Sequence, residues 1–350
     1  MRQREVRSVC LEASTVCQLK CPTCPTSNGT IAKAVGAGFL SYETFKRFID
    51  KNPGVCDVEL SNWGEIFLNP DLKKIIQYAH KNNVALRAEN GANLDKVTDD
   101  VLEALVRYKF RRLTCSIDGA SQEVYSLYRI NGDFKRVISN LRKINFCKKK
   151  YASPYPSLKW QFVAFEHNEN EIVKAWSLAK ELNMDFYLKL SWDDLYAEAF
   201  SPVKNRELIR RESGLGVADR TEFQERYGRN YMAGCCHDLW LKPSINFDGR
   251  LLGCCINYWA DYGNAFEAGL KNCVNSEKLN YAKQMLSGLK EPRNDIPWSD
   301  CKIYETRRKF NSWIKANDLR RYYVRDRRIN MLENRVSTFI TKLLRKEFTK

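Results

Sequence analysis

Six short apolar or β-branched runs alternate with segments of helical period between residues 6 and 190, and this alternation restricts the fold more than any other feature of the chain. The strand-like runs lie at 6–11, 55–60, 84–88, 113–117, 158–165 and 186–190. The helical periods lie at 42–49, 70–80, 99–108, 134–146 and 169–182. Strands that alternate with helices form a parallel sheet with right-handed crossovers. The sequence therefore predicts an α/β fold, a partial (β/α)6 TIM barrel, whose chemistry lies at the carboxyl ends of its strands.

Two of the predicted helices carry start signals. Asn69 stands before Pro70, and this pair predicts an N-cap followed by proline at the first helical position. Thr98 precedes Asp99 and Asp100, two acids that favour the first turn of a helix. Both signals place a helix directly after a predicted strand and loop.

Beyond residue 192 the composition changes, so we divide the chain into a barrel at 1–192 and three further segments. Residues 193–233 are polar and weakly periodic, which predicts a linker or a cover over the active site. Residues 234–304 are rich in cysteine, glycine and aromatics and predict a second module. Residues 305–350 hold 14 Lys or Arg against five Asp or Glu, so nine of the net charges of +16 lie in this tail.

The tail contains a candidate amphipathic helix. Apolar residues recur at Val336, Phe339, Ile340, Leu343 and Leu344, with basic residues around them. Such a helix could lie on an anionic membrane surface, or it could pack on the barrel or on a partner. The basic and aromatic run RRYYVRDRR has no recognition fold around it, so nucleic acid is not an expected partner.

Thirteen cysteines in a chain without an export signal call for an explanation. No apolar run reaches the roughly 18 residues that cross a bilayer, and the N-terminus lacks an apolar signal stretch. The odd number of cysteines and their clustering favour reduced thiolates that hold metal over disulfides. The sequence therefore predicts a cytoplasmic metalloprotein.

The run CQLKCPTC places Cys17, Cys21 and Cys24 just after the first predicted strand. Three thiolates on one loop can ligate three irons of a [4Fe–4S] cluster and leave the fourth iron open. Zinc is the main alternative, but a structural zinc site usually draws four ligands from two paired motifs. Because no second Cys or His pair lies nearby in the sequence, the spacing favours an iron–sulfur cluster.

This spacing resembles the CxxxCxxC signature of radical S-adenosylmethionine (SAM) enzymes, which follows the first strand of a partial TIM barrel. The run SNWGEIFLNPDL is similar to the Gly-Gly-Glu stretch of that family. The resemblance implies that the backbone carbonyls of Gly64 and Glu65 receive the SAM amino group. AENGANL resembles the Thr-Asn-Gly turn of the family through Asn90 and Gly91.

Two later strands extend the resemblance. Ser116 in LTCSIDGA and Arg129 in YSLYRINGDF match residues that hold the SAM carboxylate, and Gln161 is a further candidate contact. An arginine can clamp a carboxylate through two hydrogen bonds, which a lysine cannot do. The resemblance implies reductive cleavage of SAM to methionine and a 5′-deoxyadenosyl radical. Thr23 replaces the aromatic that many members place before the third cysteine, which predicts a different contact near the adenine edge.

A second group of cysteines lies in CCHDLWLKPSINFDGRLLGCC. A strand that enters the Asp-Gly turn and returns as a second strand would bring both cysteine pairs to one end of a hairpin. This segment resembles the start of the α+β SPASM or twitch extension, which binds auxiliary iron–sulfur clusters. INYWADYGNAFE is similar to the Gly-Asn segment of the same extension.

The remainder of the SPASM pattern is reduced to one cysteine, Cys301, and Trp298 stands where a CxxC partner is expected. The resemblance implies one auxiliary cluster. Its candidate ligands are Cys236, Cys254 and Cys301, with a fourth from Cys255 or Cys235. A three-cysteine cluster whose open iron binds substrate is one alternative, and a zinc site is another. The other cysteines are interpreted as packing residues, namely Cys10, Cys56, Cys115, Cys147 and Cys273.

The substrate is inferred from what the chain lacks and from its charge. Enzymes of this layout include sugar and aminocyclitol dehydrogenases, epimerases and peptide maturases. The first predicted strand begins within ten residues of Met1, so the leader-binding domain that maturases often carry is not expected. The net charge of +16 favours an anionic substrate. We predict a radical SAM oxidoreductase or epimerase acting on a small, carbohydrate-like or anionic substrate or a glycan.

Two alternatives to this function stay open, a peptide maturase and a non-catalytic zinc-binding scaffold. Asp193, Asp194 and Lys189, near the end of the sixth predicted strand, are candidates for acid–base catalysis, although solvated loop charges would look the same. A radical SAM enzyme also needs an electron donor such as flavodoxin or ferredoxin. These groups complete the predicted site.

Overall fold

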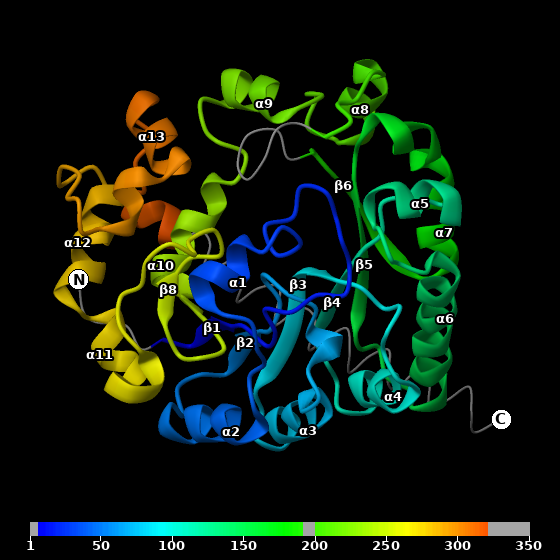
Figure 1. The fold of residues 1–350 in the computed structure, drawn as a ribbon, viewed down its shortest axis with the longest axis horizontal. Helices are drawn as coiled ribbons and strands as arrows, with labels where there is room; N and C mark the ends of the chain where they lie inside the picture. Colours follow the sequence, from blue (N-terminus) through cyan, green and yellow to red (C-terminus); the bar gives the residue numbers. More distant parts are fainter. Residues whose placement is uncertain (1–5, 192–199, 321–350) are drawn as a thin grey trace.

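One sheet of eight strands organises the part of the chain that the computed structural model describes, residues 6–191 and 200–320 (Figure 1). The strands are β1 (Ser8–Leu11), β2 (Asp57–Glu59), β3 (Ala85–Ala92), β4 (Arg112–Ser116), β5 (Ser157–Val163), β6 (Met184–Lys189), β7 (Ser244–Ile245) and β8 (Leu251–Gly253). Their order is β6-β5-β4-β3-β2-β1-β7-β8. Neighbours among β1 to β6 run parallel, which confirms the predicted α/β class.

Helices cover the outer side of the curved sheet (Figure 1). They are α2 (Tyr42–Lys51), α3 (Leu72–Lys81), α4 (Asp99–Arg107), α5 (Gln122–Tyr128), α6 (Phe134–Lys150) and α7 (Ile172–Glu181). A short helix α1 (Thr30–Val35) follows the first strand and its loop. The sequence pattern did not predict α1 and α5; the strands β1 to β6 and the other helices listed here agree with it within about four residues at each end.

The strand register gives the sheet one apolar face and one polar face. Val9 pairs with Val58, and Val58 pairs with Leu86, so apolar side chains share a level and a face. On the opposite face Glu59 pairs with Arg87 and both side chains are buried. Because helices cover the apolar face, buried charges on the other face must be satisfied by partners within the sheet or by a ligand.

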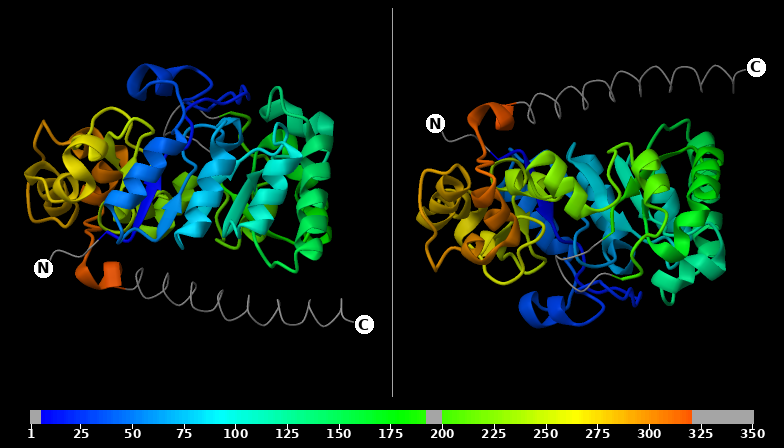
Figure 2. Two further views of the ribbon diagram at one scale, coloured as in Figure 1. Left: turned by 90° about the horizontal axis from the view of Figure 1, so that it is seen from below. Right: turned by 90° about the horizontal axis from the view of Figure 1, so that it is seen from above.

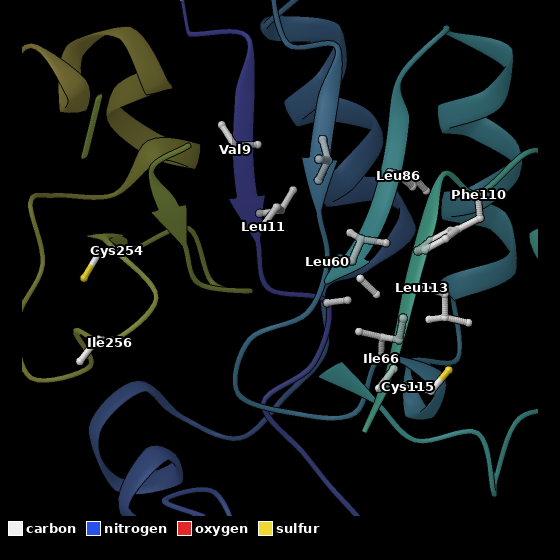
Figure 3. Packing of buried hydrophobic residues seen from close by; sticks show 14 of the residues in the cluster. Val9, Leu11, Leu60, Ile66, Leu86, Phe110, Leu113, Cys115, Cys254 and Ile256 are labelled. Carbon is white, nitrogen blue, oxygen red and sulfur yellow. The ribbon is translucent and has the colours of Figure 1, made fainter. Parts of the chain in front are cut away.

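One continuous apolar core lies between the sheet and the helices and extends into the cysteine-rich segment (Figure 3). Leu11, Leu60 and Leu113 are completely buried in it, as is Cys254 from the second module. The two predicted modules therefore share their packing. The boundaries at 192, 233 and 304 stay a prediction.

The start of α3 differs from the sequence prediction. The helix begins at Leu72 with Asp71 as its N-cap residue, so Asn69 does not cap it. The Asn69 side-chain amide instead donates to the carbonyls of Ala13 at 2.8 Å and Leu40 at 2.9 Å. The Asn69 side-chain oxygen, the atom that would cap a helix, accepts from the Asp71 amide at 2.8 Å and forms a turn just before α3. Thr98 does occupy the N-cap of α4, but its side chain makes no capping hydrogen bond.

The cysteine-rich segment adds a hairpin to the sheet. β7 and β8 are antiparallel, as the Asp-Gly turn predicts, and Gly249 in that turn has φ +94°. The pairing of β7 with β1, parallel with Cys10 opposite Ser244, was not predicted. The Asn264 amide donates to the Asp248 carbonyl at 3.0 Å, so the Gly-Asn segment closes over the turn.

Helices α10 to α13 lie beside β1 at one end of the molecule (Figure 2). They are α10 (Asp238–Leu241), α11 (Leu270–Val274), α12 (Glu277–Leu286) and α13 (Lys302–Lys309), with short turns η3 (Ala233–His237), η4 (Ala265–Gly269) and η5 (Pro297–Asp300). The predicted amphipathic tail helix lies outside the described residues. None of the helices in the described ranges has the length and apolar character needed to span a bilayer.

The segment after β6 contains two short helices, α8 (Arg206–Glu212) and α9 (Arg220–Tyr227), that the weak periodicity did not predict. An ion-pair network joins them. The Glu222 carboxylate binds Arg206 and also accepts from Arg210 Nη2 at 2.6 Å. Hydrogen bonds from Arg210 and then Arg206 lower the pKa of Glu222 to about 2.

Because Glu222 has a lower pKa in the folded state, its pairing stabilises the protein above the unfolded pKa, and this contribution is lost as the pH falls toward 2. Glu222→Gln is expected to lower the free energy of unfolding by about 1 kcal/mol at pH 7, and the difference from wild type should shrink below the unfolded pKa. Urea titrations at several pH values measure this. Glu207→Gln, on an 85%-exposed side chain that also pairs with Arg210, is the control and should change little. A difference that does not depend on pH would contradict the argument.

Candidate cofactor and metal site

The predicted metal-binding loop connects β1 to α1. The Cys24 amide donates to the Cys21 carbonyl at 3.2 Å, and the Cys24 carbonyl accepts from Ser27 at 3.0 Å. Cys21 is buried, whereas Cys17 and Cys24 are partly exposed, and all three are free thiols. Burial, and next the Glu65 carboxyl, raises the pKa of Cys17 to about 12. A bound cation would remove this penalty on the thiolate, which suits the loop to metal.

Within the described residues, no three His, Cys, Asp or Glu side chains are grouped in a way that could hold a metal ion. The cysteines are therefore candidate ligands rather than an assembled site. Their fit to a cluster is tested by what surrounds them. The loop carries three thiols, of which two are partly exposed and the third accepts a hydrogen bond from an arginine. This arrangement is suited to a cluster with one open iron.

Arg129 joins the cysteine loop to the ends of two strands. Its Nε donates to Asp118 Oδ2 at 2.6 Å, and its Nη1 donates to Cys21 Sγ at 3.5 Å. Asp118 is completely buried after β4 and also accepts from the Val163 amide at 2.6 Å. The guanidinium is therefore held in one orientation beside the loop. Arg129 therefore lies beside the cysteine loop, and its Nε–H group is already bound to Asp118.

Removing Asp118 would leave the Arg129 charge buried without its carboxylate partner. We expect Asp118→Ala to lower the free energy of unfolding by roughly 3–5 kcal/mol. Chemical denaturation under anaerobic conditions measures the change. Glu181→Ala is the control, because Glu181 pairs with Arg142 between exposed side chains and should cost less than about 1 kcal/mol. Equal effects of the two changes would refute the role given to Asp118.

Gly64 and Glu65 lie against the backbone that leads into the cysteine loop. A Cβ added at Gly64 would meet the Ser14 carbonyl oxygen at 2.3 Å and the Val16 nitrogen at 2.7 Å. The Glu65 amide donates to the Val16 carbonyl at 2.8 Å. Its carboxylate accepts from the Asn93 amide at 2.6 Å, and burial raises the pKa of Glu65 to about 8. The hydrogen bond from Glu65 to Val16 fixes the segment directly before Cys17.

The predicted residues of the next three strand ends also meet. A Cβ at Gly91 would lie 2.4 Å from Ser116 Oγ, and Gly91 has φ +124°. Gln161 Nε2 donates to Ser116 Oγ at 3.3 Å, and the two residues are register partners in β4 and β5. Asn90 is exposed, and its amide donates to the Ser61 carbonyl at 2.7 Å. The carboxyl ends of β3, β4 and β5 therefore converge as the motifs require.

Of the three candidate acid–base residues, only Lys189 is described. It ends β6 and is partly exposed. Burial, and next the charge of Arg220, lowers the pKa of Lys189 to about 8. Asp193 and Asp194 lie outside the described residues.

Two residues beside the loop were missed in the sequence. Glu12, completely enclosed after β1, accepts from the amides of Trp63 and Gly64, and burial raises the pKa of Glu12 to about 8. Tyr128 hydrogen-bonds through its hydroxyl to Thr23 Oγ1 at 2.7 Å, and its ring centre lies 4.5 Å from that of Phe165. In the sequence, Glu12 could have been recognised as a single acid at a strand end, and Tyr128 as an aromatic directly before Arg129. Tyr128 supplies the aromatic beside the loop that Thr23 lacks.

The second group of cysteines gathers where the hairpin, η3 and α13 meet. Interactions with the thiols of Cys236, Cys254 and Cys255 raise the pKa of Cys235. The bond from Cys235, and beyond it the Arg307 guanidinium, lowers the pKa of Cys236 to about 7. Cys301 interacts with Cys236 and Cys254. Arg307 was not predicted, because its place in the sequence is within the basic tail.

Residues 11–146 match a sequence model of the Radical SAM superfamily. The match supports a radical SAM protein. Radical SAM proteins use a [4Fe–4S] cluster and SAM, so the match implies both cofactors for this chain. The matched range includes the cysteine loop and the strand ends that hold Gly64, Asn90, Ser116 and Arg129.

Similar proteins support the radical SAM fold. The chain is 29% identical over 186 residues to the AdoMet-dependent heme synthase of Methanosarcina barkeri strain Fusaro, and the alignment covers 52% of this chain and 49% of that protein. The chain thus spans about half the length of this relative. Streptococcus suis SuiB bound to S-adenosylmethionine has a TM-score of 0.60 at 15% identity, covering 79% of this chain and 67% of SuiB. Native anSMEcpe with bound AdoMet has a TM-score of 0.55 at 16% identity, covering 87% and 96%.

Proposed function

We propose that the protein is a radical SAM enzyme in which Cys17, Cys21 and Cys24 hold a [4Fe–4S] cluster. The observation that carries this proposal is one loop that bears three thiols, that accepts a hydrogen bond from the Arg129 guanidinium at Cys21 and that lies against Gly64 directly before Cys17. When reduced, the bound cluster supplies the chemistry that splits SAM into methionine and a 5′-deoxyadenosyl radical.

The chain's own residues would hold SAM by its charged ends. The backbone at Gly64 and Glu65 offers carbonyls for the amino group, and Ser116 with Arg129 offers donors for the carboxylate. Asp118 orients the Arg129 guanidinium, so its remaining N–H groups are fixed before SAM arrives. Asn90 and Gln161 complete the candidate contacts at the neighbouring strand ends.

An aromatic cluster beside the loop would keep water away from the reacting atoms. Tyr128 and Phe165 are buried with Cys21, and Phe200 packs on both rings. A radical reacts with any hydrogen donor within reach, so exclusion of solvent protects the intended reaction. Since Phe200 follows β6 in the chain, its packing on these rings supports the proposal that the segment around it covers the active site.

We infer a small anionic or carbohydrate-like substrate that is oxidised or epimerised. The support is the polar face of the sheet, where Glu59 and Arg87 are buried and Lys189 ends β6. A lysine with a pKa of about 8 can exchange a proton near neutral pH, so Lys189 is the proposed acid–base residue.

A second, SPASM- or twitch-like site is proposed at Cys236, Cys254 and Cys301, with Cys235 or Cys255 as the fourth ligand. The support is that the Cys235 thiol interacts with those of Cys236, Cys254 and Cys255, and that Cys301 interacts with Cys236 and Cys254. An auxiliary iron–sulfur cluster there would accept one electron from the substrate radical left after hydrogen abstraction, which would complete the oxidation of the substrate.

A step of heme synthesis is a second candidate function. The similarity to the AdoMet-dependent heme synthase favours it. A heme precursor is anionic, as the polar face of the sheet and the net charge of +16 require. Adding such a precursor to the reduced enzyme and following its oxidation by mass spectrometry separates this candidate from a sugar-like substrate.

The proposed activity is tested by reconstituting the protein with iron and sulfide without oxygen, reducing it with dithionite and adding SAM. We expect 5′-deoxyadenosine and methionine in equal amounts. Absence of 5′-deoxyadenosine from protein that contains a full cluster would overturn the proposal.

We further propose a cytoplasmic enzyme that takes electrons from flavodoxin or ferredoxin, with its basic tail available for an anionic membrane surface.

A further inference from the structure

Three buried hydrogen-bond donors in the second module have no acceptor among the described residues, the Ser244 hydroxyl, the Tyr262 hydroxyl and the Trp298 indole N–H. The last two belong to the segments next to the proposed ligands. Tyr262 is 4% exposed and Trp298 is 1% exposed, so bulk water does not reach them freely. Leaving a buried donor unsatisfied costs roughly 1–3 kcal/mol. Two such donors in one small module indicate an acceptor that the polypeptide itself does not supply.

Both donors belong to the segments that carry the proposed ligands. The Tyr262 amide donates to the Leu251 carbonyl at 2.8 Å, and a Cβ at Gly253 would lie 3.1 Å from Tyr262 Cε2. The ring therefore covers the residue directly before Cys254. Trp298 lies in η5, and its carbonyl accepts from the Cys301 amide at 3.0 Å. Burial, and next the thiols of Cys254 and Cys301, raises the pKa of Tyr262.

The thiol sulfurs are not the missing acceptors. Within the described residues, neither the Tyr262 hydroxyl nor the Trp298 indole N–H forms a hydrogen bond with an acceptor, cysteine sulfur included. A zinc ion held by the same four thiolates would bring no further acceptor, so both donors would stay unsatisfied. An iron–sulfur cluster brings inorganic sulfides, which extend beyond the thiols and accept hydrogen bonds.

We propose that Tyr262 and Trp298 donate hydrogen bonds to the sulfides of an iron–sulfur cluster bound in this module, and that they select this cluster over zinc. This inference rests on the auxiliary site of the proposed function. It also gives a role to Trp298, which stands where the pattern expects a cysteine: it contributes a donor in place of a ligand. The two residues are positioning residues that tune the cluster.

Hydrogen bonds to sulfide stabilise the reduced, more negative cluster and raise its reduction potential. Tyr262→Phe removes one oxygen and Trp298→Phe removes the indole N–H. Both changes should shift the midpoint potential of the auxiliary cluster to more negative values. Tyr281→Phe is the matched control, because the Tyr281 hydroxyl is satisfied by the Glu291 carbonyl at 3.2 Å and the change should leave the potential in place.

The measurement uses the full chain with Cys17, Cys21 and Cys24 changed to alanine, so that only the second site holds a cluster. Iron, zinc and acid-labile sulfide are counted first, and the potential is then followed by EPR during a redox titration. In the parent protein the reduced EPR signal should contain an exchangeable proton coupling that weakens in Tyr262→Phe. If Trp298→Phe fails to fold, Tyr262→Phe still decides the question.

Two results would overturn the inference, and they differ in what else they overturn. Sulfide present with an unchanged potential and proton coupling in Tyr262→Phe would refute the hydrogen bond and leave the auxiliary cluster intact. Zinc without sulfide in the anaerobically reconstituted protein would refute both the inference and the auxiliary cluster. Neither result affects SAM cleavage at the first loop, which is measured separately.

Discussion

Changing Cys17, Cys21 and Cys24 together to alanine is expected to abolish reductive SAM cleavage, a loss of at least roughly 10³-fold in the rate of 5′-deoxyadenosine formation. The physical reason is that these thiolates are the only proposed protein ligands of the cluster that meets SAM. Since no other described residue replaces them on this loop, the iron has no alternative site beside Arg129. Quantifying 5′-deoxyadenosine by chromatography after anaerobic reduction gives the result.

The control for this variant is Cys273→Ala. Cys273 is a buried thiol in α11 that is not among the proposed metal ligands, and its loss should leave SAM cleavage within roughly twofold of wild type. Iron content should fall in the triple variant and stay constant in the control. If the triple variant still cleaves SAM at the wild-type rate, the cluster is not held by this loop.

Gly64→Ala is the second change with a large expected effect. The added methyl group would lie 2.3 Å from the Ser14 carbonyl oxygen, which is backbone and cannot rotate away. The strand end must therefore move, and it leads through Val16 into Cys17. Because displacement of a site by about 1 Å can cost 10²-fold, we expect at least that loss in SAM cleavage.

Gly29→Ala is the comparison for Gly64→Ala. Gly29 is on the same loop with φ +83°, and nothing lies within 4 Å of an added Cβ. Its replacement introduces backbone strain of about 1 kcal/mol without a steric clash. SAM binding, measured by equilibrium dialysis, should weaken strongly in Gly64→Ala and little in Gly29→Ala. Equal weakening in both would show that the close contact with Ser14 is unimportant.

The periodic pattern was sufficient to predict the parallel sheet, because alternating strands and helices leave few other arrangements. The motifs also predicted that Gly91, Ser116 and Gln161 lie at neighbouring strand ends. In the structure Gly91 lies against Ser116 Oγ, and Gln161 donates a hydrogen bond to the same oxygen. Asn69 was wrong as a helix cap, since its side-chain oxygen accepts from the Asp71 amide in the turn before α3 and its side-chain N–H groups bind two carbonyls of distant segments. Local patterns cannot report such contacts.

Other features depend on neighbours that only the folded chain supplies. The pairing of β7 with β1 joins residues more than 230 positions apart, and no periodicity encodes it. Arg307 reads as one of many tail cations until folding places it at Cys236.

The central claim is that SAM binds the open iron of a cluster held by the first cysteine loop. The most direct test is electron–nuclear double resonance on the reduced wild-type protein, in which Cys17, Cys21 and Cys24 are intact. The added SAM carries ¹⁵N at its amino group. We predict a nitrogen hyperfine coupling to the cluster that disappears without SAM. A reduced cluster whose spectrum is unchanged by labelled SAM at saturating concentration would contradict the account.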